Sequence, residues 1–95
     1  PFCRLIAIII SANNQSLSIE GARQIKRHLS KIIGLEIMGP VDSPLLKIKK
    51  KFRSRLLIRF NEKSLKQKMV SNLLNSLKIS SKIKLTVDVD PVNFG

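Results

Sequence analysis

Apolar and polar residues alternate from Lys51 to Phe60, which predicts a strand with one buried face. The even positions are apolar or small, and the odd positions are basic apart from Leu57. Residues 82–90 alternate in the same way, and Pro91 should end that strand because proline has no amide hydrogen for the ladder. The predicted inward positions of this last strand are Ile83, Leu85, Val87 and Val89.

Two further segments of the chain are predicted to be strands. In residues 2–11, both the even and the odd positions are mostly apolar, with Arg4 as the exception. This pattern is expected for a central strand that is covered on both faces. Residues 35–41 form a shorter strand that bends or ends at Gly39–Pro40. A loop over residues 45–50 should then carry several lysines into the basic strand.

Steps of three and four residues between apolar positions predict two amphipathic helices. The first begins near Ser16 or Ser18, either of which can cap it, and ends at Gly34 in a left-handed conformation. The second begins near Asn61 or Ser64. The inward residues are Ile19, Ala22, Ile25, Leu29 and Ile32 in the first helix, and Leu65, Met69, Val70, Leu73, Leu74 and Leu77 in the second.

The predicted order is strand, helix, strand, strand, helix, strand, and both helices need an apolar surface to cover. This order indicates an α+β protein with a ferredoxin-like βαββαβ fold, in which two helices lie on one face of a four-stranded antiparallel sheet. The first and third strands are then central neighbours, and the basic row of the third strand stands on the open face. Residues 1–95 are enough for one domain.

The net charge of +12 favours polyanionic partners, namely nucleic acid, an acidic membrane surface or an acidic protein tail. Residues 47–60 contain seven of the basic residues and no carboxylate. Phe52 and Phe60 share the inward parity, so the open face has no aromatic residue for base stacking, and contact with the phosphate backbone is expected. The candidate DNA-binding residues are Lys47, Lys49, Lys50, Lys51, Arg53 and Arg55.

Candidate residues for catalysis or metal binding are few. Asp88 and Asp90 lie on one strand face without a third acidic residue or a histidine nearby, so we predict structural ion pairing for them and no metal site. His28 has no second ligand, and Cys3 cannot form an intramolecular disulfide. Cys3 is predicted to be a small buried strand residue, and the cysteine content fits a reducing cytoplasm. No membrane span and no catalytic residue are predicted.

Three motifs together resemble a known family. They are Gly39–Pro40 with the proline-containing loop after it, the basic strand over residues 51–58, and the closing Val87-Asp88-Val89-Asp90-Pro91-Val92. Together they are similar to the C-terminal domain of bacterial primosomal protein N-prime, the replication-restart helicase PriA. The resemblance covers nearly the whole chain, although members of the family usually carry an aromatic residue at the position of Ser54.

The resemblance implies a fold like that of ribosomal protein S10 and a parent enzyme that unwinds DNA in the 3′ to 5′ direction at abandoned replication forks. The parent family implies ATP and zinc as cofactors. Its motor motifs and zinc-binding cysteines are absent from this sequence, so we expect a C-terminal accessory domain without enzymatic activity or cofactors of its own. A start at Pro-Phe-Cys-Arg without methionine fits a piece of a longer polypeptide.

The partners implied by the resemblance are branched or single-stranded DNA and the other domains of the parent helicase. A further implied partner is the acidic C-terminal tail of single-stranded-DNA-binding protein, received in part by Lys63. Two alternatives remain open. The chain can be a docking module whose basic face receives an acidic protein tail without touching DNA, or a stand-alone S10-like RNA-binding protein.

Overall fold

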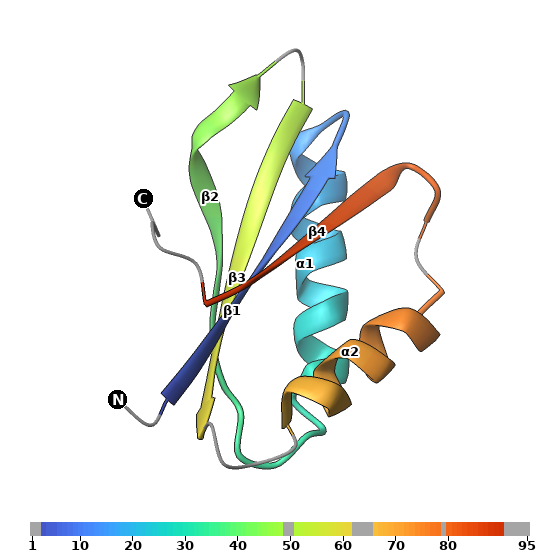
Figure 1. The fold of residues 1–95 in the computed structure, drawn as a ribbon. Coiled ribbons are helices and arrows are strands. Elements are labelled where there is room, and N and C mark those ends of the chain that lie inside the picture. The colour runs from blue at the N-terminus through green and yellow to red at the C-terminus, as the bar shows by residue number, and fades with distance from the viewer. Residues whose placement is uncertain (1–2, 49–50, 62–65, 79, 91–95) are drawn as a thin grey trace.

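Two helices pack on one face of a single four-stranded antiparallel sheet (Figure 1). The computed structural model describes residues 3–48, 51–61, 66–78 and 80–90. The elements are β1 (Cys3–Ala12), α1 (Gln15–Leu29), β2 (Glu36–Ile48), β3 (Lys51–Asn61), α2 (Lys66–Ser76) and β4 (Ile83–Val89). The strands are ordered β2-β3-β1-β4, which confirms the predicted βαββαβ fold with β1 and β3 as central neighbours.

The core lies between the sheet and the helices. The even-numbered side chains of β1 and β3 point toward α1, and apolar side chains of both helices complete the layer. The buried core residues are Ile6, Ile8, Ile10, Leu56, Ile58 and Phe60 from the sheet and Ala22, Ile25, Leu29 and Val70 from the helices. Each large side chain buried here contributes about 1.5–3 kcal/mol to folding. The odd-numbered side chains of β1 and β3 therefore lie on the face that the helices leave open.

Helix α1 begins and ends at residues other than those predicted. Asn14 caps it, with Oδ1 accepting a hydrogen bond from the backbone N–H of Leu17 at 2.8 Å, so the prediction of Ser16 or Ser18 as cap is wrong. Ser18 is instead fully buried. The helix ends at Leu29, and the positive φ of Gly34 (+95°) belongs to the turn that follows it.

Strand β2 extends beyond the predicted strand and into the predicted loop. Lys47 pairs opposite Phe52, although the register shifts between Met38 and Val41 and again between Asp42 and Lys47. Gly39 has a φ of +106°, and a Cβ on it would lie 2.6 Å from the carbonyl oxygen of Arg55. Only glycine fits this close approach between β2 and β3.

Strand β4 lies at an edge of the sheet and is covered by the helices over only part of its length. Ile83 and Leu85 pack against the core as predicted. Val87 and Val89 were predicted to point inward into the core, but their side chains are 46% and 37% exposed because the apolar cluster ends at Leu85 on this strand. Cys3, predicted to be buried, is exposed at the start of β1. Neither helix among the described residues is long and apolar enough to cross a membrane.

Candidate nucleic-acid interface

Arg53, Ser11 and Lys84 lie in one row across the open face of the sheet. Ser11 of β1 is the register partner of Arg53 in β3 and of Lys84 in β4. Neighbouring strands are separated by about 4.8 Å, so the backbones of the two cationic residues are about 10 Å apart. The two basic side chains, 31 positions apart in sequence, therefore flank a single hydroxyl group.

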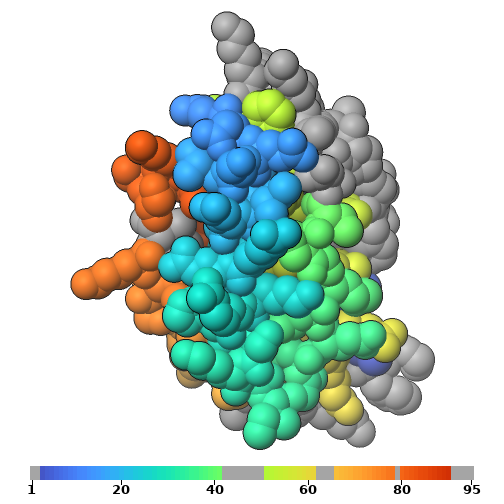
Figure 2. All heavy atoms as spheres, turned by 180° about the vertical axis from the view of Figure 1, so that it is seen from behind, coloured from blue at the N-terminus to red at the C-terminus, as the bar shows by residue number. Residues whose placement is uncertain are grey.

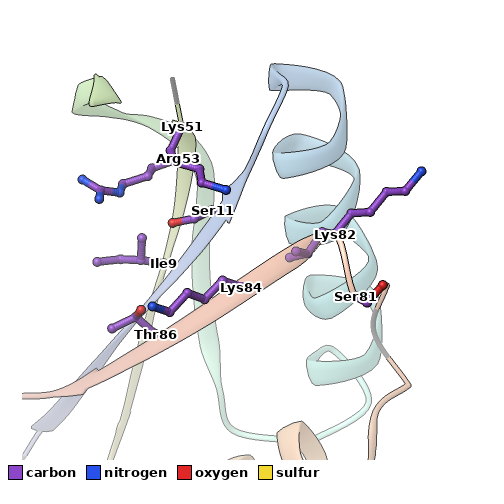
Figure 3. Close-up of a pocket in the computed structure, with 9 residues that line it drawn as sticks. Ile9, Ser11, Lys51, Arg53, Ser81, Lys82, Lys84 and Thr86 are labelled. Atoms are coloured by element: carbon purple, nitrogen blue, oxygen red, sulfur yellow. The ribbon is translucent and has the colours of Figure 1, made fainter. Parts of the chain in front are cut away.

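A hollow of about 470 Å³ lies around this row at the end of the sheet (Figure 3). It is lined by Ile9, Ser11, Lys51, Arg53, Ser81, Lys82, Ile83, Lys84 and Thr86. Among the residues that the structure describes, the lining contains four cationic residues, three hydroxyl groups and no carboxylate. Figure 3 shows Arg53 and Lys84 directed to the same side of the sheet, whereas Lys82 extends away from them. We refer to this region as the basic hollow.

Lys51 is held at the rim of the basic hollow by a contact with the turn before α1. Its Nζ donates a hydrogen bond to Oδ1 of Asn13 at 2.7 Å, and the side chain is exposed. An ammonium group has more N–H donors than this bond uses, so Lys51 can still donate to an anion. The contact orients a long, flexible side chain in advance. It thereby lowers the loss of side-chain conformational entropy when an anion binds.

No described carboxylate lines the basic hollow, and two carboxylates of the sheet form ion pairs elsewhere. Glu36 of β2 pairs with Arg59 of β3, its register partner. Asp90 pairs with Arg4, whose Nε lies 2.7 Å from Oδ2, and it also accepts a hydrogen bond from the backbone N–H of Leu5 at 3.1 Å. On the open face, Arg59 is therefore neutralised by Glu36, whereas the described lining of the basic hollow includes no carboxylate.

The residues predicted from the sequence to bind DNA fall into three groups. Lys51 and Arg53 line the basic hollow. Arg55 lies two residues further along β3, opposite Ile9 and Val41, and Lys47 lies in β2. Lys49 and Lys50 lie outside the described residues, as does Lys63, the residue expected to receive a partner tail.

The predicted ion-pairing aspartates occupy different places. Asp90 forms the ion pair with Arg4 just after β4, with a φ of +51° and a backbone N–H that donates to the carbonyl of Leu5. Asp88 lies opposite Ala7 in β1 and makes no ion pair with a described residue. Only one of these two aspartates is therefore tied to a cation of a neighbouring strand in the part of the chain that the structure describes.

The sequence analysis did not include Lys82 and Lys84 among the site residues. Alternation had placed Lys84 on the outward side of its strand, which is correct, but only the pairing of β4 with β1 brings it beside Ser11 and Arg53. The relevant signal is the outward position that Lys84 and Arg53 each occupy in the alternation of their own strand, combined with the strand order of the fold. The resulting arrangement can hold anionic groups through charge and hydroxyl donors.

The family model and the similar proteins point to one and the same family. The chain matches the family model of the primosomal protein N C-terminal domain over residues 1–92. It is similar to the replication restart protein PriA of Rickettsia felis, with 35% identity over 94 residues, and of Rickettsia conorii, with 34% identity over 94 residues. Each match covers 99% of this chain but 14% of the relative, so the chain spans a small part of the length of these proteins.

The fold also occurs in a solved structure of unrelated sequence. The de novo designed protein Foldit4 superposes with a TM-score of 0.68 at 13% identity, and the match covers 96% of this chain and 99% of that one. At this identity the likeness concerns the fold alone. The family match confirms the resemblance seen in the sequence motifs, and the chain belongs to the family of primosomal protein N C-terminal domains.

Proposed function

We propose that this chain is an accessory DNA-binding domain of a replication-restart helicase and that its basic hollow binds the phosphate backbone of branched or single-stranded DNA. The observation that carries the proposal is the row formed by Arg53, Ser11 and Lys84, with Lys51 beside it and no carboxylate among the described lining residues. Cations in such an arrangement replace the counterions of DNA, which provides affinity for the backbone.

The proposed contact does not distinguish one base sequence from another. Phe60 is buried in the core, and Phe52 has the same parity in β3, so neither presents a ring to the open face for stacking on bases. Phosphate contacts fix the position of a protein on DNA without reading its sequence. Such binding suits a domain that acts wherever replication stops.

A docking role within the parent protein completes the proposal. Ile32, Met69 and Leu73 line an apolar groove between the end of α1 and helix α2, and the Met69 side chain is 44% exposed. We propose that other domains of the same polypeptide cover this groove, and that the ATP-driven unwinding and the zinc sites belong to those domains. The support is that the chain spans 14% of the length of its relatives.

A binding titration tests the DNA-binding part of the proposal. We expect a fluorescently labelled fork to bind the wild-type chain, and the substitutions Arg53→Gln and Lys84→Gln together to weaken binding about tenfold or more. The matched control is Arg59→Gln with Lys68→Gln, which removes the same charge from a residue already paired with Glu36 and from an exposed residue of α2.

The same titration with an acidic peptide separates the two classes of partner. If the peptide binds the wild-type chain and DNA does not, the chain is a protein-docking module and the proposal fails. If the hollow variant and the control variant are weakened by the same factor in their affinity for the fork, the basic hollow is not the binding site. Circular dichroism of each variant establishes that a loss of affinity does not result from unfolding.

A further inference from the structure

A second row of cations lies on the helical face of the molecule. Arg23 and Arg27 are four residues apart on α1, and Lys31 follows four residues later in the turn after the helix. All three side chains are exposed. Figure 2 shows this face, with α1 running across its centre between β2 and α2. We call these three residues the α1 row.

The fold accounts for only part of the α1 row. None of its side chains forms an ion pair or a side-chain hydrogen bond with a described residue, whereas Lys26 on the same helix donates to the carbonyl oxygen of Gly39 at 2.6 Å. Cations in the last turn stabilise a helix through its dipole, which gives Arg27 a structural role. Arg23 lies in the middle of α1, where that effect is absent.

The exposed side chains around the α1 row favour phosphate over protein as its partner. The exposed residues of α1 and of the turns beside it, as far as Lys31, are all polar: Asn13, Asn14, Gln15, Ser16, Glu20, Arg23, Arg27, Ser30 and Lys31. Protein interfaces are anchored by large apolar and aromatic side chains, and residues 13–31 expose none, whereas the exposed Ile33 and the apolar groove at Met69 lie outside this stretch. Glu20 is the only carboxylate on α1, and it lies at the end of the row away from Lys31.

The spacing of the α1 row fits a nucleic-acid backbone. Four residues of helix correspond to a rise of about 6 Å, so the three cations span about 12 Å. Along the axis of a duplex, each strand carries one phosphate per about 3.4 Å, so a row of this length spans the rise of about three to four phosphates. The α1 row thus places its charges on the length scale of successive phosphates.

The two basic surfaces lie on opposite sides of a thin molecule. The basic hollow is on the open face of the sheet and the α1 row is on the outer side of the helix layer, and the shortest Cα extent is 16 Å. We propose that the α1 row binds a second DNA segment while the basic hollow holds the first, so that one domain bridges two arms of a branched substrate. This inference rests on the proposed function of the basic hollow.

A bridging measurement on the 95-residue chain tests the inference. Two linear duplexes, one with a donor dye and one with an acceptor dye, are mixed with the chain, and energy transfer reports their approach. We expect transfer with the wild-type chain and a loss of roughly tenfold in transfer with the triple variant Arg23→Gln, Arg27→Gln, Lys31→Gln. The affinity of this variant for a single duplex, measured by fluorescence anisotropy, should differ from that of the wild-type chain by less than about threefold. The reason is that its basic hollow is intact.

A matched variant with the same loss of charge is Lys51→Gln, Arg53→Gln, Lys84→Gln. It should weaken single-duplex binding about tenfold or more and abolish transfer, since the basic hollow no longer holds the first segment. Sedimentation of the wild-type chain alone shows whether it is monomeric, because a dimer would bridge duplexes without the α1 row.

The outcomes separate the two proposals. If the wild-type chain binds no duplex, the proposed function fails. If it binds a duplex and the α1 variant still gives wild-type transfer, or no transfer occurs with the wild type, only the bridging inference is overturned. Loss of binding to a polyglutamate peptide in the α1 variant, with transfer unchanged, would assign the row to an acidic protein partner and would also overturn it.

Discussion

The salt dependence of DNA binding gives the most quantitative test of the basic hollow. Under the proposed function, Lys51, Arg53 and Lys84 of the basic hollow contact phosphates of one duplex segment. Each phosphate neutralised contributes about −0.9 to the slope of log affinity against log salt concentration, so three contacts predict a slope of about −2.7. Between about 50 and about 200 mM salt, the affinity of the wild-type chain should then fall about 40-fold.

The variant Arg53→Gln with Lys84→Gln retains one of these three contacts, so its slope should be about −0.9 and its affinity should fall only about 3.5-fold over the same range. Anisotropy titrations at five or so salt concentrations, repeated with two unrelated duplex sequences, measure both slopes. The charge-matched control Arg59→Gln with Lys68→Gln should keep the wild-type slope. Equal slopes for the two variants, or slopes that depend on the base sequence, would refute the assignment of these residues as phosphate contacts.

Three further predictions concern stability and are measured by urea unfolding. Gly39→Ala should lower the free energy of unfolding by roughly 2 kcal/mol or more, because its Cβ would lie 2.6 Å from a backbone oxygen, whereas Gly34→Ala meets only the end of a lysine side chain and should cost less. Ser18→Ala should cost about 1–3 kcal/mol because it leaves the buried hydroxyl of Ser54 without its 2.9 Å contact, and the double variant with Ser54→Ala should cost less than the sum of the two single changes. Ile8→Ala should cost about 2–5 kcal/mol, while Val87→Ala, its register partner on β4, should cost well under that; equal losses would contradict the observed exposure of Val87.

The sequence pattern was sufficient to predict the elements that carry one buried face. Alternation in β3 predicted which side chains face the helices and which face outward, and the observed burial follows the predicted parity from Ser54 to Phe60. The order of elements then led to the correct fold, because few arrangements let two amphipathic helices share one sheet face. Alternation is a local property, which is why it predicted the orientation of Arg53 and Lys84 separately but not their position beside each other.

The errors arose where tertiary contacts decide between locally equivalent choices. Asn14, Ser16 and Ser18 can all cap a helix, and the burial of Ser18 against β3 leaves Asn14 as the cap. Val87 continues the alternation of β4, but whether an inward position is covered depends on the reach of the helices, which the strand sequence does not contain. Cys3 is exposed for a similar reason, since it lies at the open end of a central strand.

Ser54, which departs from the aromatic residue expected in other members of the family, belongs to the core and not to the open face of the sheet. Its side chain is fully buried and meets Ser18 of α1 at 2.9 Å between the hydroxyl oxygens. The same side of α1 carries Gly21, where a Cβ would lie 2.8 Å from a side-chain carbon of Ile83. Small residues on the helix and a small residue in β3 therefore go together, because they let α1 lie close to the sheet. An aromatic side chain at position 54 would need a larger separation at this point, so the difference at Ser54 concerns the packing of α1 on the sheet. Arg53 and Arg55, its neighbours on the opposite face, keep the outward orientation that the proposed contact with DNA requires.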